Sequence, residues 1–278
     1  MDWNKSNTIL IIAFIVLNIF LFTSSYNNIF SEEYDVTTDE QFMESLENIL
    51  MKKNITINSE IPKETYTLPT LDTEYEIVNI TSGFLQSFLG PGVEPIENVT
   101  NYSNEKGETL EIIDGKKLHY TVRENVSGKI ENKDIIAEKI NNFIKDKKID
   151  ETGYSEDYRS IQGDGLLVVY TKHHNNFCLD NSYMNFYLDK EGIYKFEMQN
   201  ILTIKETAEK THTFSAAESL PILLSYEDVE NKEIVQIEMS YYSVEDGNWQ
   251  YIFGINSYPA WKVIFSDGTQ RHLARFNL

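Results

Sequence analysis

The stretch LEIIDGKKLHYTV, Leu110–Val122, decides the fold class because it holds two strand-like segments around a tight turn. Leu110–Ile113 and Leu118–Val122 are rich in apolar and β-branched residues, which favours strands. Asp114-Gly115 lies between them, and both residue types tolerate the positive φ that tight hairpin turns require. The stretch therefore predicts an antiparallel hairpin.

Helical patterns lie on both sides of this hairpin. The downstream helix has one apolar face between Lys133 and Lys148, formed by Ile136, Ile140, Phe143 and Ile144. The upstream helix has a comparable face, formed by Phe42, Met43, Leu46, Ile49 and Leu50. Thr37 with Glu40 is typical of a capping box at the start of that upstream helix.

Further strand-like segments follow each helix. They are Thr65–Leu68, Tyr75–Ile80, Leu166–Tyr170, Tyr183–Leu188, Ile193–Ile204, Ile234–Tyr242, Tyr251–Ile255, Trp261–Phe265 and Gln270–Phe276. Turns are expected at Asp189–Gly192, Asp246-Gly247 and Asp267-Gly268. Ser215 with Glu218 indicates a third helix start, which Pro221 keeps short or kinked.

A helix followed by a strand meander thus occurs twice. This pattern predicts an α+β fold with two helix-plus-antiparallel-sheet subdomains, residues 34–128 and 129–278, divided near Gly128. A doubly wound parallel sheet is not expected, because no βαβ rhythm with phosphate-binding glycines is present.

The N-terminus has a different character. Thr8–Phe22 reads TILIIAFIVLNIFLF, and continuing to Tyr26 gives the ~20 residues that a membrane-spanning helix needs. We therefore expect a transmembrane helix over residues 8–26. A cleaved signal peptide is the alternative, but the basic n-region is weak and Thr23-Ser24-Ser25 is a mediocre cleavage site.

Flanking charges indicate the orientation of this helix. Lys5 precedes it, and an acidic segment follows it, formed by Glu32, Glu33, Asp35, Asp39 and Glu40. The positive-inside tendency places residues 1–7 in the cytoplasm and the rest of the chain outside the cell membrane.

Composition limits the partners. The 278 residues carry 24 Lys and Arg against 44 Asp and Glu, a net charge of −20, so the surface repels phosphate backbones and no nucleic-acid partner is expected. Cys178 is the only cysteine, which excludes an internal disulfide and a multi-cysteine metal site. An exported protein with one thiol fits a Gram-positive cell.

No catalytic motif is found, so we expect no catalytic, cofactor-binding or metal-ligating residue and no enzymatic activity. His173-His174 would point to opposite faces of a strand and could not easily share a metal. Gln162–Gly165 could present Asp164 to a ligand, but a turn is the simpler interpretation. A wall-active hydrolase would need Cys178 to meet His212 or His272, and nothing in the sequence supports that meeting.

A binding protein remains an alternative. The strands are rich in tyrosine, and Tyr241, Tyr242, Tyr251 and Tyr258 are candidates for a recognition face. Strand propensity alone also explains them. A deep cleft lined by these tyrosines would favour an extracytoplasmic cell-wall or solute-binding protein.

Three short motifs resemble the YycI (WalI) family. They are Met1-Asp2-Trp3 with Lys5, Leu17-Asn18-Ile19-Phe20-Leu21 in the apolar helix, and Pro259-Ala260-Trp261-Lys262-Val263 followed by Asp267-Gly268. Chain length and single-helix architecture also agree. The resemblance implies a non-enzymatic, single-pass membrane regulator of the WalK–WalR (YycG–YycF) two-component system, which controls cell-wall metabolism. It further implies a YycH-like extracytoplasmic fold, with the sensor histidine kinase WalK and a YycH-like protein as partners.

One polar residue in the apolar helix suggests where a partner binds. Asn18 is costly in hydrocarbon unless its amide finds a hydrogen-bond partner. At helical spacing it shares a stripe with Ile11, Phe14, Ile15, Leu21 and Phe22. We expect this stripe to face a neighbouring helix, unless Asn18 lies shallow enough to reach water or headgroups.

Overall fold

The computed structural model describes residues 39–130, 135–243 and 254–274. The chain divides into two compact units, residues 1–49 and 50–278. Most of helix α2 (Asp39–Leu50) belongs to the first unit and confirms the predicted upstream helix. The Thr37 cap and the segment 8–26 lie outside the described residues. Within the described part of the chain, no helix has the length and apolar character needed to cross a membrane.

The second unit is α+β and mostly antiparallel, which confirms the predicted class. Its helices are α3 (Ser82–Leu89), α4 (Ile135–Lys147) and α5 (Ala216–Ser219), with 3-10 turns at Met51–Lys53, Leu220–Ser225 and Glu227–Val229. Its strands are β1 (Thr56–Ile57), β2 (Thr67–Tyr75), β3 (Asn101–Ser103), β4 (Thr109–Ile113), β5 (Lys117–Thr121), β6 (Tyr154–Gln162), β7 (Gly165–His174), β8 (Phe177–Asp189), β9 (Gly192–Gln199), β10 (Ile201–His212), β11 (Glu233–Tyr242), β12 (Gly254–Phe265) and β13 (Gln270–Leu273).

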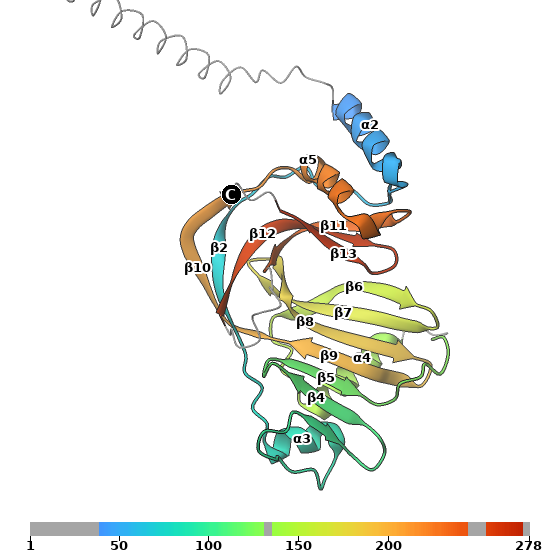
Figure 1. Cartoon of the computed structure of the whole chain (residues 1–278), viewed down its shortest axis with the longest axis vertical. Helices are drawn as coiled ribbons and strands as arrows, with labels where there is room; N and C mark the ends of the chain where they lie inside the picture. The colour runs from blue at the N-terminus through green and yellow to red at the C-terminus, as the bar shows by residue number, and fades with distance from the viewer. Residues whose placement is uncertain (1–38, 131–134, 244–253, 275–278) are drawn as a thin grey trace, which may run out of the picture. The chain divides into compact units, whose positions relative to one another are not determined.

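The strands fall into two groups (Figure 1). The central group runs in the order β6-β7-β8-β9-β5-β4-β3. The C-terminal group consists of β10-β2-β12-β11, with β13 beside β12 and β1 beside β11. A short parallel pairing of β8 with β11, Cys178 to Ser240 and Leu179 to Tyr241, connects the two groups.

The predicted hairpin is present as β4 and β5. Asp114 and Gly115 both have positive φ, 52° and 68°, and the Lys116 amide donates to the Ile113 carbonyl at 3.1 Å. The turn residues therefore perform the role that their types predicted.

The predicted downstream helix is α4, and its apolar face packs into the core of the central group. Ile136, Ile140 and Ile144 are buried together with Leu85 of α3 and Phe186 and Phe196 of the sheet. Burial of each such side chain contributes about 1.5–3 kcal/mol to folding. The apolar stripe thus explains why this segment is helical and where it docks.

The third helix start is confirmed as well. The Ser215 hydroxyl accepts from the Glu218 amide at 3.3 Å, and the Glu218 carboxylate accepts from the Ser215 amide at 2.9 Å. The α-helix lasts four residues and continues as a 3-10 turn that contains Pro221. Pro221 cannot donate a helical hydrogen bond, which accounts for the short element.

Three strand predictions are wrong. Trp261–Phe265 is not a separate strand from the described end of Tyr251–Ile255, because both belong to β12. Residues 76–80 are not a strand: the Glu76 amide donates to the Asn200 carbonyl and the Val78 amide to the Gly115 carbonyl, two isolated bonds rather than a ladder. The predicted strand Ile193–Ile204 is two strands, β9 and β10. The chain breaks at Asn200 because it passes there from the central group to the C-terminal group.

The subdomain boundary near Gly128 stays a prediction. Strands on either side of it pair with each other, since β5 lies beside β9 and β2 lies beside β10 and β12. The turn predicted at Asp246-Gly247 and the strand start predicted at Tyr251 lie outside the described residues.

Candidate functional site

A buried ionic cluster lies where the two strand groups meet, and Lys262 is at its centre. Lys262 lies on β12 in a run of buried residues, 259–265, and its side chain has no exposure. Its ammonium contacts Asp157 Oδ2 at 2.7 Å, Asp180 Oδ1 at 3.0 Å and Glu238 Oε1 at 2.6 Å. A buried ammonium requires such partners, because the protein interior solvates charge poorly.

The sheet brings these side chains together from separate strands. Glu238 of β11 is the antiparallel cross-strand partner of Lys262, so the two side chains lie on one face of the sheet. Asp157 comes from β6 and Asp180 from β8, both in the central group. The cluster therefore links the central group to the C-terminal group by charge.

Mutual attraction sets most of the charge states in this cluster. Burial alone would lower the pKa of Lys262, but Asp180, Asp157 and Glu238 raise it well above its usual range. Burial likewise tends to raise the pKa of Asp180 and of Glu238. The charge of Lys262, together with hydrogen bonds from His272 to Asp180 and from Gln236 to Glu238, outweighs burial and holds both pKa values below their usual range. Lys262, Asp180 and Glu238 are therefore charged at neutral pH.

Asp157 is the exception. Burial and the negative charge of Glu238 raise its pKa and Lys262 lowers it, and the net pKa is about 6. Its Oδ2 accepts hydrogen bonds from Lys262 and from the Thr171 hydroxyl at 2.9 Å, but its buried Oδ1 has no hydrogen-bond partner among the described residues. One ammonium shared among several carboxylates thus leaves Asp157 the easiest carboxylate to protonate.

His272 of β13 extends the cluster toward the surface. Its Nε2 lies 2.6 Å from Asp180 Oδ2, and its ring stacks on Tyr242 with the centroids 4.6 Å apart and an interplanar angle of 7°. Asp180 therefore connects His272 to Lys262 through its two carboxylate oxygens.

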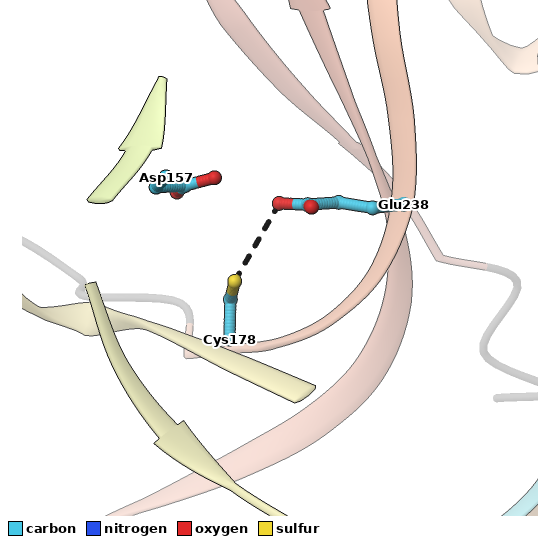
Figure 2. A group of neighbouring side chains, drawn as sticks. All are labelled: Asp157, Cys178 and Glu238. Carbon is cyan, nitrogen blue, oxygen red and sulfur yellow. Dashed lines mark hydrogen bonds between the residues drawn. The ribbon is translucent and has the colours of Figure 1, made fainter. Parts of the chain in front are cut away.

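Cys178 lies at the edge of the cluster, close to Glu238 and Asp157 (Figure 2). Its Sγ is 3.6 Å from Glu238 Oε1 and 3.4 Å from His173 Nε2. Burial raises the pKa of the Cys178 thiol strongly, only partly offset by Lys262. A protonated thiol is a poor nucleophile and a poor metal ligand, because both roles need the thiolate.

Three of these residues have the spacing of metal ligands. The ligand atoms of Asp157, Cys178 and Glu238 lie within 4.8 Å of one another, a spacing that could accommodate a cation. However, the ammonium of Lys262 already lies within 2.7 Å of both carboxylates. The chain supplies its own cation at this place, so the donor set does not fit a metal.

Sequence reasoning missed this convergence. We expected no meeting of Cys178 with His212 or His272; the structure brings His272 into the same cluster through Asp180, and places His173 beside Cys178. His212 lies elsewhere, 3.0 Å from the Thr67 hydroxyl. Lys262 in the otherwise apolar run 259–265 is the signal in the sequence that could have indicated a buried counter-charge.

The remaining polar candidates are explained by local structure. His173 and His174 have different partners, as expected on a strand: His174 lies 3.1 Å from Glu206. Asp164 is in the two-residue turn between β6 and β7, where Gly163 has φ 62°, and it forms an exposed ion pair with Lys129 at 3.7 Å. The turn interpretation is confirmed.

Tyr241 and Tyr242 do not share a face, whereas Tyr258 is the cross-strand partner of Tyr242. Tyr241 is buried against Phe177, ring centroids 6.3 Å apart, whereas its neighbour Tyr242 stacks on His272. Tyr251 lies outside the described residues, as does the predicted transmembrane stripe Ile11, Phe14, Ile15, Asn18, Leu21 and Phe22.

Comparisons with known proteins identify relatives. The model of the family described as "YycI protein" matches residues 34–277. No curated protein sequence matches the chain significantly. Among solved structures, an uncharacterized protein from Eubacterium rectale aligns with 11% identity over 83% of this chain and 90% of its own, TM-score 0.44.

Two further solved structures align over much of the chain. YycH from Bacillus subtilis aligns with 12% identity over 86% of this chain and 62% of its own, TM-score 0.48. The C-terminal domain of YpeB from Bacillus megaterium aligns with 8% identity over 69% of this chain and 95% of its own, TM-score 0.34. These likenesses are remote.

Proposed function

The chain belongs to the YycI family, and from this premise we propose that it is a membrane-anchored accessory regulator of the WalK–WalR two-component system, which controls cell-wall metabolism. The observation that carries the proposal is the family match, which extends over residues 34–277. Its proposed partners are the sensor histidine kinase WalK and a YycH-like protein.

The anchor belongs to the same proposal. Residues 8–26 cross the cell membrane as a single helix, residues 1–7 are cytoplasmic and the α+β region is extracytoplasmic. The apolar run Thr8–Phe22 and the acidic segment after it support this topology.

We propose a non-enzymatic role. The cluster around Lys262 supports it, because each of its carboxylates is engaged by the same ammonium and the Cys178 thiol is held protonated. Groups arranged in this way hold a fold together. A regulator that acts through contacts needs a stable external domain of this kind and no reactive side chain.

Co-purification tests the partners. The full chain, carrying an affinity tag, is expressed at native level in a Gram-positive host and recovered from detergent-solubilised membranes, and bound proteins are identified by mass. We expect the kinase and the YycH-like protein to co-purify. An unrelated single-pass protein with the same tag is the control, and recovery of neither partner above that control would refute the proposal.

Protease accessibility tests the topology. Protease added to intact, wall-stripped cells is expected to digest the chain after Ser31 and to spare a tag placed before Trp3. A mature protein starting near Tyr26 and recovered from the medium would instead show that the apolar run is a cleaved signal peptide.

A further inference from the structure

The central group contains a cavity of about 270 Å³. Its walls come from α3, β5, β9, the end of α4 and the irregular segment after β2. The residues that line it are Glu76, Val78, Asn79, Phe84, Phe88, Lys116, Leu118, Lys147, Lys148, Ile149, Asp150, Met198 and Asn200. The cavity has no part in the Lys262 cluster and does not depend on the proposed function.

One side of the cavity is apolar. Phe84 and Phe88 of α3 lie against it, with ring centroids 5.4 Å apart, together with Leu118 of β5 and Met198 of β9. Aromatic and aliphatic walls with a few polar groups are typical of pockets for small organic molecules.

The polar side is rich in lysine, which is unusual in a chain of net charge −20. Lys116 is buried, with 5% exposure, and its ammonium lies 4.6 Å from the ring centroid of Tyr75. Lys147 donates to the Phe88 carbonyl at 2.8 Å and to the Tyr120 hydroxyl at 3.2 Å, both neutral oxygens. Burial lowers the pKa of Lys147, with Glu108 opposing.

The two acids at the cavity are engaged by neighbours. The Glu76 carboxylate accepts from the Asn200 amide at 2.7 Å, and the Asp150 carboxylate accepts from the Thr152 amide and hydroxyl at 3.0 and 2.6 Å. Lys147 forms an ion pair with neither in the described structure. An anion that entered the cavity would therefore meet a half-buried ammonium whose described hydrogen bonds go to neutral oxygens. A hydrogen bond between two charged groups is roughly twice as strong as one between neutral groups.

We propose that this cavity binds a small organic anion with an apolar body, its anionic head at Lys147 and its body against Phe84, Phe88 and Met198. At about 30 Å³ for each water-sized group, the volume holds about nine non-hydrogen atoms. Octanoate is close to that size and has both chemical features, and it serves as the probe.

Calorimetric titration of the full chain in phosphatidylcholine nanodiscs tests the ligand class, with the signal of empty nanodiscs subtracted. We expect saturable binding of octanoate and binding of octanol, which lacks the charge, weaker by about tenfold. Acetate, which lacks the apolar body, is expected to give no saturable signal. Equal binding of octanoate and octanol, or no octanoate signal above empty nanodiscs, would overturn the proposal.

A matched pair of lysine variants locates the site. Lys147→Gln is expected to weaken octanoate binding by about tenfold, whereas Lys145→Gln, an exposed position on the same helix that does not line the cavity, changes it by less than about twofold. Equal affinities of the two variants would refute the assignment.

A labelling experiment on the unmutated chain covers the case in which Lys147→Gln does not fold. Acetic anhydride modifies exposed amines, and modified lysines are quantified by peptide mass spectrometry. Octanoate is expected to protect Lys147 and to leave Lys145 unchanged. Equal modification of Lys147 with and without octanoate would place the ligand elsewhere and overturn the proposal.

Discussion

Lys262 is a charged residue at a position where the strand pattern calls for an apolar one. It follows Trp261 and precedes Val263, both buried. Taking an ammonium out of water costs several kcal/mol, and the attraction of nearby carboxylates offsets this cost only when the geometry is good. Contacts of 2.6 to 3.0 Å to three carboxylates meet that condition. The charge of Lys262 departs from the apolar pattern of its own strand, and carboxylates from other strands offset the cost of burying it.

Removal of the Lys262 ammonium should therefore strongly lower the stability of the fold. Lys262→Met is expected to destabilise the fold by about 3–5 kcal/mol, because it leaves buried carboxylates without a counter-charge. The measurement is urea unfolding of the full chain in micelles, followed by circular dichroism. Lys129→Met is the control: Lys129 is 73% exposed in its ion pair with Asp164, so its loss is expected to cost less than about 1 kcal/mol. Similar losses for both variants would contradict the buried cluster.

Asp157 makes stability depend on pH in a defined direction. Its folded pKa of about 6 lies above the usual value of 3.8, so the folded state binds a proton more tightly than the unfolded state does. The contribution of Asp157 to stability consequently falls as pH rises from about 4 to about 6, by roughly 3 kcal/mol at most. Asp180 and Glu238, whose pKa values are lowered, act oppositely: their stabilisation is lost as pH falls below about 4.

Asp157→Asn isolates the pH dependence that comes from Asp157. The stability of this variant relative to the unmutated chain is expected to rise between pH 4 and pH 6 and to level off above pH 6, in urea unfolding at a series of pH values. Asp164→Asn, at the exposed turn, should show no such trend. A difference that stays constant over this range, or that moves in favour of the unmutated chain, would show that Asp157 is not protonated preferentially.

At the scale of elements, the sequence correctly predicted helices and turns that are stabilised by residues within the same segment. The apolar stripe of α4 and the Asp114-Gly115 turn depend on neighbours in sequence, and both are confirmed. The same is true of the Ser215 cap. Period, turn chemistry and capping therefore sufficed where an element is stabilised by residues within its own segment.

Elements stabilised by distant partners were missed. β6 reads YSEDYRSIQ and lacks the apolar alternation of a typical strand, so no strand was predicted there. It forms because β7 supplies its hydrogen-bond ladder and because the Lys262 ammonium donates to the Asp157 carboxylate. The break at Asn200 was missed for a similar reason, since it depends on which strands lie on either side of it.

The turn between β12 and β13 offers a test at this scale. Gly268 has φ 83°, and a Cβ on it would lie 2.6 Å from Ser160 Oγ of β6. Gly268→Ala is expected to cost about 1 kcal/mol for the left-handed backbone and about 1–3 kcal/mol more for overpacking.

Gly107 provides the matched control for this test. It has a similar φ of 81°, but a Cβ on it would meet nothing within 4 Å. Gly107→Ala should therefore show the backbone cost alone, about 1 kcal/mol, in the same thermal unfolding experiment. Equal shifts in Tm for the two variants would mean that β6 does not press against the β12–β13 turn.

At the scale of the whole molecule, the candidate site could not be predicted because it is assembled from five strands. Asp157 and His272 are far apart in sequence, and nothing local distinguishes them from the other acids and histidines of the chain. The cluster forms only when the parallel pairing of β8 with β11 brings the two strand groups together. Family membership, by contrast, was predicted from three short motifs, and the family match over residues 34–277 confirms it.

The proposed regulator also requires a means of meeting its partners, and the proposed transmembrane helix offers one. Asn18 shares a helical stripe with Ile11, Phe14, Ile15, Leu21 and Phe22. An amide in hydrocarbon gains about 1–2 kcal/mol at best from a partner across a helix interface, enough to bias association without controlling it alone. We propose that this stripe faces the helix of the kinase or of the YycH-like protein.

Asn18→Leu tests that stripe. The substitution keeps the helix apolar, so insertion is expected to stay intact, while association with the partner weakens by up to about tenfold because the interhelical hydrogen bond is lost. Association is measured by energy transfer between labelled full chains in bilayers, and signalling output is followed in cells. Ile12→Leu and Val16→Leu, on other faces of the helix, should change neither. Equal association of Asn18→Leu and the unmutated chain would indicate that Asn18 reaches water or headgroups. Recognition would then belong to the extracytoplasmic domain.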